Sequence, residues 1–435
     1  MAAQTSTTRD LTSWDPENAE TWDRRLAWRT LSITTYNLTL AFAVWYLVSA
    51  IAPRLTMIGF DLSAGQLYWL VAVPGLAGGL MRLVFMFLPP VLGTRTLVGG
   101  SATLLLIPMI GWALAVRDAT TPYSVLILLA AATGIGGGAF AGFMPSTSYF
   151  FPRRMSGTAL GLQAGLGNFG VSLIQFLVPW VVGFGLLGTA ALTPQTTVDG
   201  GQLWLHNAGL VLIPWVLAGI VMAALFLRRV PVTANFRQQL DIFSNRDTWL
   251  MTAIYTMTFG AFSGFAAQLG LLILNEYGHF ADAPDPLKFA FLGPLLGSVT
   301  RAAWGPLCDR FGGAVWTLVA GIGMTASTAF TLFFLDPHDV GQFTWFLAGM
   351  LAIFTFAGIG NAGTFKQMPM IFDRRQAGGV IGFTSAIAAF GPFLVGMALS
   401  VWSPRAFFIG AAAYFALCTW LTWSNYARPG ARRPS

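Results

Sequence analysis

The chain has 435 residues, of which 55% are hydrophobic and 9% are charged. Soluble domains carry roughly 25% charged residues, so a soluble globular protein, a disordered chain and a collagen-like chain are excluded. The 24 Lys and Arg residues exceed the 17 Asp and Glu residues, and because most of this excess flanks apolar runs, it indicates membrane topology rather than nucleic-acid binding.

Twelve apolar segments follow a polar N-terminal stretch, and a helix needs roughly 20 residues to cross a bilayer. The stretch at 1–30 lacks the short apolar core of a signal peptide, so we expect a cytoplasmic N-terminal segment there. We therefore predict an all-α membrane protein with twelve transmembrane helices, at residues 31–53, 66–90, 96–116, 122–151, 156–187, 206–227, 247–274, 287–308, 313–335, 342–371, 376–401 and 404–426.

A basic linker between the sixth and seventh segments divides the chain into halves. The linker covers residues 228–246. We expect a six-helix bundle on each side of it, at 31–227 and 247–426, followed by a cytoplasmic tail at 427–435.

Basic residues in the loops predict which side of the membrane each loop occupies. Cytoplasmic loops carry the excess of Lys and Arg. Seventeen loop or terminal arginines fall on one side of the predicted topology and four basic residues on the other, so we expect both termini in the cytoplasm. The four are Arg54, Arg117, Lys288 and Arg405, and the seventeen are Arg9, Arg24, Arg25, Arg29, Arg95, Arg153, Arg154, Arg228, Arg229, Arg237, Arg246, Arg310, Arg374, Arg375, Arg428, Arg432 and Arg433.

An internal repeat relates the two halves. The fourth segment contains Gly-Ile-Gly at 134–136 and Met-Pro at 144–145, and the tenth contains the same groups at 358–360 and 368–369. Two six-span halves of like orientation are typical of transporters built from parallel repeats.

Three basic residues lie inside the predicted spans: Arg82, Arg301 and Lys366. Arg82 precedes Gly93 by eleven residues and Arg301 precedes Gly312 by eleven, so the two arginines are equivalent in the repeat. We expect every Asp, Glu and His to lie in a terminus or loop, which leaves the intramembrane charge entirely positive. Burying an Arg at mid-span costs a few kcal/mol. Because a guanidinium donates planar pairs of hydrogen bonds, we expect a small planar oxyanion to join the two arginines.

The alternative is that these side chains snorkel to the interface or bond to backbone carbonyls. Arg82 and Arg301 lie about sixteen and fourteen residues into their spans, which disfavours snorkelling. Lys366 precedes the basic turn at 373–375 by about seven residues, so for this residue snorkelling and a pore position are equal alternatives.

Polar and aromatic residues near the arginines are further candidates. Asn168 lies in a glycine-rich run at 161–170, and its amide needs either an anion or a neighbouring helix as partner. Phe140, Tyr255 and Phe259 are, taken singly, more typical of a packed core than of a binding site.

The end of the eighth segment carries a charged pair. Asp309 and Arg310 adjoin the membrane and suggest a conformational latch, in which Asp309 caps a helix or pairs with a neighbouring Arg. The two cysteines, Cys308 and Cys418, indicate neither a disulfide framework nor a metal cluster.

These residues resemble the nitrate/nitrite porter family of the major facilitator superfamily over essentially the whole chain. Lys366 stands where some members of that family carry an uncharged residue such as Gln. The matching motifs are Trp14 to Glu17, Gly59 to Asp61 with Gln66, Leu67 and Pro74, Gly157 to Gly170, Gly305 to Gly313, and Gly382 to Phe393.

The resemblance implies the major facilitator fold and a nitrate or nitrite ion clamped between the two arginines. It also implies the other members of the site. The expected substrate contacts are Arg82, Arg301, Asn168, Tyr255, Phe140, Phe259, Gly382 and Ser385, with Lys366 as proton-coupling candidate and Asp309 and Arg310 as latch.

We therefore expect a secondary transporter in the inner membrane of a bacterium that moves nitrate, and nitrite, by alternating access. Proton symport is the expected coupling, because Lys366 offers a titratable group, and nitrate/nitrite exchange is the alternative. A carrier or channel for another small anion ranks lower. We expect a monomer without enzymatic activity, cofactor, metal or nucleic-acid partner, whose partners are nitrate, nitrite, protons and the lipid bilayer.

Overall fold

The computed structural model describes residues 11, 14–20, 22–186, 192–230, 237–372 and 374–431. Within this part of the chain, eleven stretches are long and apolar enough to cross a membrane. The expected eighth span corresponds to α12 (Leu292–Phe311), which is not among the eleven. Its charged residues, Arg301, Asp309 and Arg310, lower its mean hydropathy.

The described residues of the first half form eight α-helices, one short 3₁₀ helix and one short hairpin. The hairpin pairs β1 with β2 in antiparallel fashion between the fifth and sixth spans. The elements are α1 (Arg24–Trp45), α2 (Leu47–Leu55), η1 (Thr56–Ile58), α3 (Ala64–Phe85), α4 (Pro89–Ala115), α5 (Tyr123–Ser148), α6 (Arg153–Val181), β1 (Gln195–Thr196), β2 (Gln202–Leu203), α7 (Asn207–Leu210) and α8 (Ile213–Phe226).

The second half repeats this helical pattern without a hairpin in the described residues. Its elements are η2 (Arg237–Ser244), α9 (Arg246–Tyr255), η3 (Thr256–Gly260), α10 (Ala261–Tyr277), α11 (Pro286–Phe289), α12, α13 (Gly313–Thr331), η4 (Leu332–Phe334), η5 (Val340–Gln342), α14 (Phe343–Ile371), α15 (Arg374–Ala388), α16 (Gly391–Val401), α17 (Pro404–Thr422) and η6 (Trp423–Ala427).

Several spans begin or break at places that hydrophobicity does not mark. Helix α1 begins at Arg24, seven residues before the expected start of the first span, because the Asp23 carboxylate accepts the Leu26 N–H and caps the helix. The expected linker at 228–246 contains a 3₁₀ segment, η2. The eleventh span is divided between α15 and α16.

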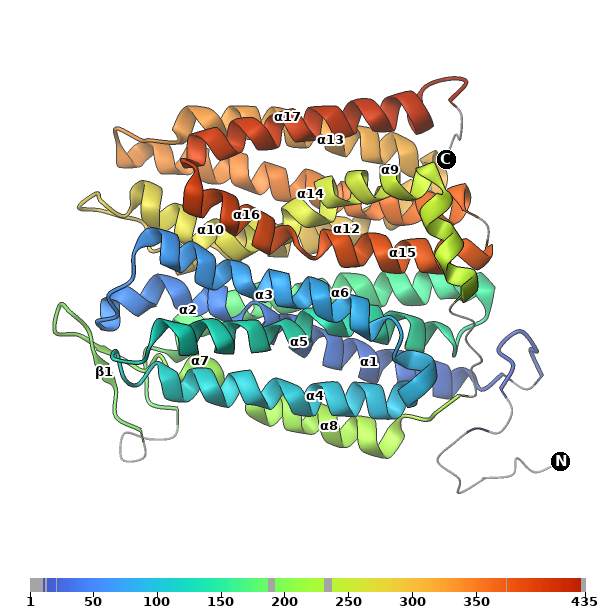
Figure 1. Cartoon of the computed structure of the whole chain (residues 1–435), viewed down its shortest axis with the longest axis horizontal. Helices are drawn as coiled ribbons and strands as arrows, with labels where there is room; N and C mark the ends of the chain where they lie inside the picture. The colour runs from blue at the N-terminus through green and yellow to red at the C-terminus, as the bar shows by residue number, and fades with distance from the viewer. Residues whose placement is uncertain are drawn as a thin grey trace.

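The helices form two groups that lie side by side (Figure 1). Helices α1 to α8 make up one group and α9 to α17 the other, and the described ends of the chain lie at the same end of the molecule. Helix α3 packs against α16, and α6 packs against α12. These two pairs form much of the contact between the groups.

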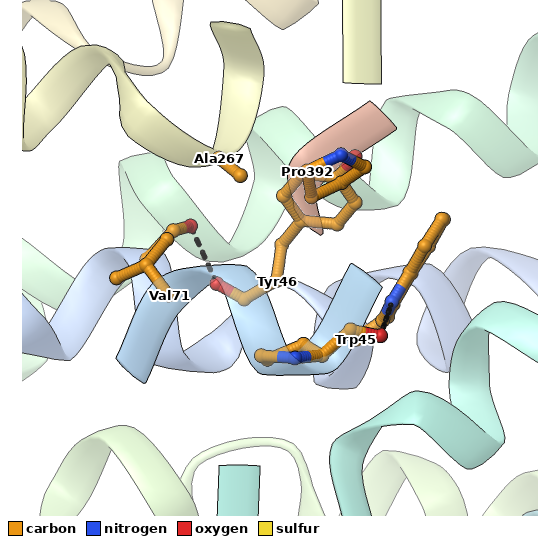
Figure 2. A pocket seen from close by; sticks show the side chains of 7 residues that line it. Trp45, Tyr46, Val71, Ala267 and Pro392 are labelled. Atoms are coloured by element: carbon orange, nitrogen blue, oxygen red, sulfur yellow. Dashed lines mark hydrogen bonds between the residues drawn. The ribbon is translucent and has the colours of Figure 1, made fainter. Parts of the chain in front are cut away.

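Side-chain hydrogen bonds join the two groups in the part of the molecule away from the termini. The Tyr46 hydroxyl donates to the Ser263 carbonyl at 3.0 Å, and the Gln175 amide donates to the Ala266 carbonyl at 2.7 Å. A Cβ added at Gly75 would lie 2.6 Å from a backbone nitrogen of α16, so α3 and α16 touch closely. A small cavity remains among these contacts (Figure 2). It is lined by Trp45, Tyr46, Ser49, Val71, Pro74, Ala267 and Pro392.

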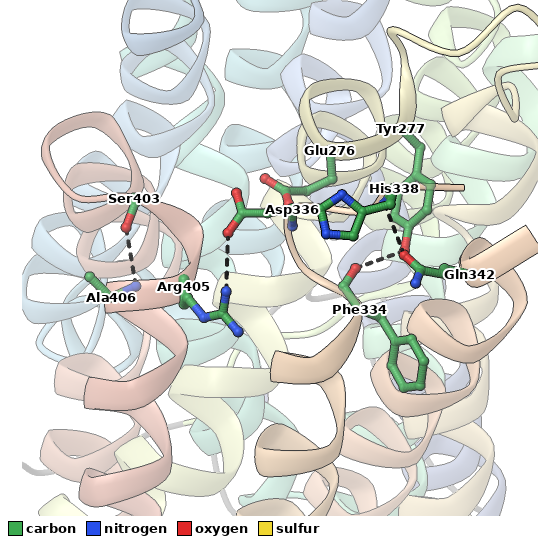
Figure 3. Close-up of polar contacts among 9 residues, drawn as sticks. All are labelled: Glu276, Tyr277, Phe334, Asp336, His338, Gln342, Ser403, Arg405 and Ala406. Carbon is green, nitrogen blue, oxygen red and sulfur yellow. Dashed lines mark hydrogen bonds and ion pairs between the residues drawn. The ribbon is translucent and has the colours of Figure 1, made fainter. Parts of the chain in front are cut away.

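Polar contacts tie the loops at the far end to the helices of the second group (Figure 3). Glu276, in the last turn of α10, accepts the Asp336 N–H at 2.9 Å, and Arg405 pairs with Asp336 at 3.6 Å. The expectation that every carboxylate lies in a terminus or loop is therefore wrong, since Asp247, Glu276 and Asp309 lie in helices. All three occupy the first or last turns, where Asp247 accepts the Tyr426 hydroxyl, Glu276 accepts a loop N–H and Asp309 pairs with Lys366.

Two glycines have the same unusual backbone conformation at equivalent places in the repeat. Gly93 has φ 70° and ψ 159°, and Gly312 has φ 88° and ψ 151°. This region of backbone space is essentially confined to glycine. Each glycine bends the chain eleven residues after an intramembrane arginine, as the repeat predicts.

We expect Gly93→Ala to lower the thermal-unfolding midpoint of the purified protein, by the equivalent of about 1–3 kcal/mol of backbone strain. The new Cβ would also lie 2.6 Å from Arg229 Cγ. Gly100→Ala in the same helix is the matched control, because its Cβ meets nothing within 4 Å. Equal midpoints for the two variants would contradict this account of the bend.

Candidate functional site

Arg82 is held in a defined orientation in the middle of the protein. Helix α3 begins with a capping box, in which the Ser63 hydroxyl accepts the Gln66 N–H and the Gln66 side chain accepts the Ser63 N–H. Arg82 is 0% exposed, and its Nε donates to the Gly137 carbonyl of α5 at 2.9 Å. Its Nη1 donates to the Ser385 carbonyl of α15 at 2.7 Å. Its Nη2 is buried without a hydrogen-bond partner.

Aromatic rings surround the Arg82 guanidinium. Its central carbon lies 4.7 Å from the centre of the Phe140 ring and 5.3 Å from that of Phe259. Trp45 and Phe42 lie at 5.4 and 5.9 Å. The negative faces of such rings attract a cation without neutralising its charge, so they stabilise the guanidinium and leave it able to bind an anion.

Arg301, on α12, has a similar environment in the second half. It is 6% exposed, its Nη1 is buried without a hydrogen-bond partner, and its guanidinium carbon lies 4.8 Å from the Phe365 ring of α14. In the described chain no carboxylate forms an ion pair with Arg82 or Arg301, whereas Arg54, Lys366 and Arg405 each have an acidic partner.

A row of three aromatic rings in contact connects the two arginines. Phe259 lies beside Arg82, and its ring is parallel to that of Tyr255 at 5.4 Å. Tyr255 in turn lies 5.2 Å from Phe365, which faces Arg301. The two guanidinium groups are close enough to repel each other, and both are within electrostatic range of the Tyr255 hydroxyl. That hydroxyl is buried and lies next to the Arg301 guanidinium.

The backbone of the seventh span is irregular where this row begins. Helix α9 ends at Tyr255 and continues as the π-helical turn η3, which contains Phe259. Such turns occur frequently at functional sites because they alter the direction in which side chains project. Here the turn places Phe259 beside Arg82, and Tyr255, immediately before the turn, lies near Arg301.

Asn168 lies on the face of α6 that meets the second half. It is 1% exposed, and neither atom of its amide has a hydrogen-bond partner. Gly165 and Gln175 share this face by helical spacing. The Cβ of Gly165 would lie 3.7 Å from Ala302, next to Arg301, and Gln175 donates across to α10. Asn168 is thus an unpartnered amide directed toward the second half.

The two expected contacts on α15 differ from each other. Ser385 contributes its carbonyl to Arg82, whereas its hydroxyl bonds to the Gly382 carbonyl within its own helix. Gly382 leaves space around it, because an added Cβ would meet Met86 at 3.8 Å and nothing closer. The glycine thus keeps this part of α15 free of side-chain atoms.

Lys366 lies apart from the two arginines. Its Nζ pairs with Asp309 Oδ1 of α12 at 2.6 Å, and the two side chains are 38% and 68% exposed. Lys366 is therefore partly exposed to solvent in this conformation, which agrees with the snorkelling alternative rather than with a position beside the arginines. The pair joins two helices of the same half, and Arg310 stacks on Phe311 at 5.1 Å.

Sequence reasoning missed Phe365, Gly137 and Trp45. Phe365 was overlooked because the charge of the adjacent Lys366 drew attention to that residue instead. Its position two helical turns after the Gly-Ile-Gly group at 358–360 could have indicated it. Gly137 acts through a carbonyl, which leaves no mark in the sequence.

Known proteins resemble the chain in sequence and in fold. Residues 35–385 match the family model of the Major Facilitator Superfamily. The chain is 54% identical over 434 residues to the probable nitrate/nitrite antiporter NarK2 of Thermus thermophilus, with 98% of each chain covered. It is 32% identical over 450 residues to the nitrate/nitrite transporter NarU of Escherichia coli strain K12, with 96% of each covered. The xylose transporter XylE of E. coli, solved in an inward-open conformation, shares the fold alone, with a TM-score of 0.67 and 13% identity over 91% of this chain and 96% of that one.

We expect Lys366→Gln to change the free energy of unfolding by less than about 1 kcal/mol, because exposed ion pairs contribute about 0–1 kcal/mol. Thermal unfolding of purified variants measures this. Arg54→Gln is the comparison, since the Arg54–Asp285 pair at 2.9 Å is less exposed, at 16% and 30%. A larger loss for Lys366→Gln than for Arg54→Gln would contradict the environment described for Lys366.

Proposed function

Because the chain belongs to the Major Facilitator Superfamily, and within it to the nitrate/nitrite transporters, we propose that it moves nitrate and nitrite across the membrane by alternating access. One observation carries this proposal. Arg82 and Arg301, one from each half, each direct a buried and unpartnered guanidinium nitrogen into a region without a paired carboxylate.

The positive charges explain why an anion is required. Two guanidinium groups within range of each other repel, and burial removes the water that would screen them. An anion between them replaces this repulsion by two attractions. Its binding energy stabilises the conformation in which the halves are closed around it, which is how a ligand shifts a conformational equilibrium.

The surroundings favour a small planar oxyanion. The guanidinium carbons lie over the rings of Phe140, Phe259 and Phe365, so apolar surfaces limit the space that an anion can occupy. The edge of a guanidinium presents paired N–H donors that match two oxygens in one plane. An organic carboxylate would require additional space for its carbon chain within this set of rings.

Two coupling modes are consistent with this site. In exchange, repulsion between the arginines prevents the empty protein from closing, so nitrate and nitrite alternate as the bridging anion. In symport, a proton accompanies nitrate, and Lys366 is the proposed carrier. Its exposed pairing with Asp309 would place that proton step at the entrance to the site rather than beside the arginines.

We further propose that the protein lies in the cytoplasmic membrane of a bacterium with both termini in the cytoplasm. The arginine-rich side of the topology supports this orientation. The described ends of the chain lie at one end of the molecule (Figure 1), which is compatible with an even number of spans.

We expect Arg82→Lys and Arg301→Lys each to reduce nitrate uptake into proteoliposomes to below about 1% of wild type, since an ammonium group cannot form the planar pair of hydrogen bonds. Both variants should remain folded by size-exclusion chromatography. Arg405→Lys is the control, because it keeps a positive charge beside Asp336 at the far end. Wild-type uptake by Arg82→Lys or Arg301→Lys would contradict the proposal that the two arginines bind the anion between them.

Uptake of labelled nitrate, with internal nitrite and a pH gradient varied separately, distinguishes the coupling modes. Exchange predicts that internal nitrite stimulates uptake and that a pH gradient alone does not. Symport through Lys366 predicts uptake driven by the pH gradient in wild type and its loss in Lys366→Gln. Unchanged pH-driven uptake in Lys366→Gln would exclude Lys366 as the carrier.

A further inference from the structure

A second unpartnered amide lies near the arginines, contributed by the second half of the chain. Asn361 lies on α14, is 0% exposed, and has no hydrogen-bond partner at either its amide nitrogen or its amide oxygen. An amide buried without partners loses the hydrogen bonds that water would give it, which destabilises the protein. Buried polar groups are normally satisfied, so this amide calls for a partner, and a bound ligand can supply one.

Helix geometry places Asn361 among the residues that frame Arg301. Phe365 follows one turn later on the same face of α14 and lies 4.8 Å from the Arg301 guanidinium. Gly358 precedes Asn361 by almost one turn and touches Thr300 of α12, the residue before Arg301. The face that carries Asn361 is therefore the face of α14 that meets α12 at the arginine.

The internal repeat assigns the same place to a residue of the first half that contacts Arg82. Gly-Ile-Gly at 134–136 precedes Gly137, and Gly-Ile-Gly at 358–360 precedes Asn361. The carbonyl of Gly137 accepts Arg82 Nε at 2.9 Å. At this position the first half supplies a backbone carbonyl beside its arginine, and the second half adds a side-chain amide.

We propose that the amide of Asn361 donates an N–H directly to the transported anion, beside Arg301. This inference rests on the proposed transport of nitrate and nitrite. Arg82 Nη2 and Arg301 Nη1 supply donors from the two halves, and Asn361 supplies a neutral donor from a third direction. Nitrate presents three oxygens in a plane and nitrite presents two. Asn361 therefore favours nitrate over nitrite.

Uptake kinetics in proteoliposomes test this role. A hydrogen bond to a charged group is strong enough that its loss in Asn361→Ala should raise KM for nitrate about tenfold to a hundredfold. The KM for nitrite should rise less. In Asn361→Asp, which keeps the shape of the side chain, a carboxylate faces the anion, so nitrate should no longer raise the thermal-unfolding midpoint.

Gln163→Ala is the matched control. Gln163 is also a fully buried amide with both atoms unpartnered. It shares its face of α6 with Gly167 and Gly170, which contact α1 rather than the second half. We expect this variant to keep the wild-type KM and the stabilisation by nitrate.

The outcomes separate this inference from the proposed function. A KM and a nitrate-induced midpoint shift in Asn361→Ala equal to those of Gln163→Ala would overturn the role of Asn361, while uptake by wild type would leave the transport function intact. Absence of uptake by wild type would instead overturn the transport function. Should Asn361→Ala be recovered unfolded, Asn361→Asp decides, because retained stabilisation by nitrate in that variant overturns the proposal equally.

Discussion

Two arginines buried near each other without an acidic partner impose the main constraint on this protein. Water would stabilise each guanidinium, and the protein interior removes that water. Two features compensate for this loss: backbone carbonyls accept hydrogen bonds from Arg82, and aromatic rings lie against both guanidinium groups. Each reduces the cost of the charge without cancelling it, so the site retains an unsatisfied preference for an anion. A carboxylate in the same place would satisfy the arginines permanently and remove the need for a substrate.

The rest of the fold holds the two guanidinium groups at a fixed position relative to each other. Glycines allow α3 to lie directly against α16, and the π-helical turn in the seventh span brings Phe259 and Tyr255 between the arginines. Hydrogen bonds such as Tyr46 to Ser263 close the part of the molecule away from the termini. The same interface that fixes the halves relative to each other therefore fixes the separation of the two guanidinium groups.

The sequence predicts the features that depend on hydrophobicity and on repeated spacing. The apolar runs locate the helices, and the eleven-residue interval to Gly93 and Gly312 identifies the two arginines as a pair. The sequence does not predict features that depend on the direction of a side chain. Lys366 lies inside a predicted span, as the arginines do, yet its long side chain reaches Asp309 on the neighbouring helix α12. Hydrophobicity does not predict the start of α1 either, because the Asp23 cap adds a polar turn before the apolar run.

The hydrogen bond from Arg82 to the Ser385 carbonyl has a consequence for the transport cycle. It joins α3 of the first half to α15 of the second. In the proposed mechanism, the guanidinium that binds the anion therefore also links two helices that move relative to each other. Any motion that moves α15 away from α3 must break the hydrogen bond from Arg82 Nη1 to the Ser385 carbonyl and leave that nitrogen without this partner. Release of the anion and reorientation of the two halves are then coupled, because the Arg82 guanidinium takes part in both.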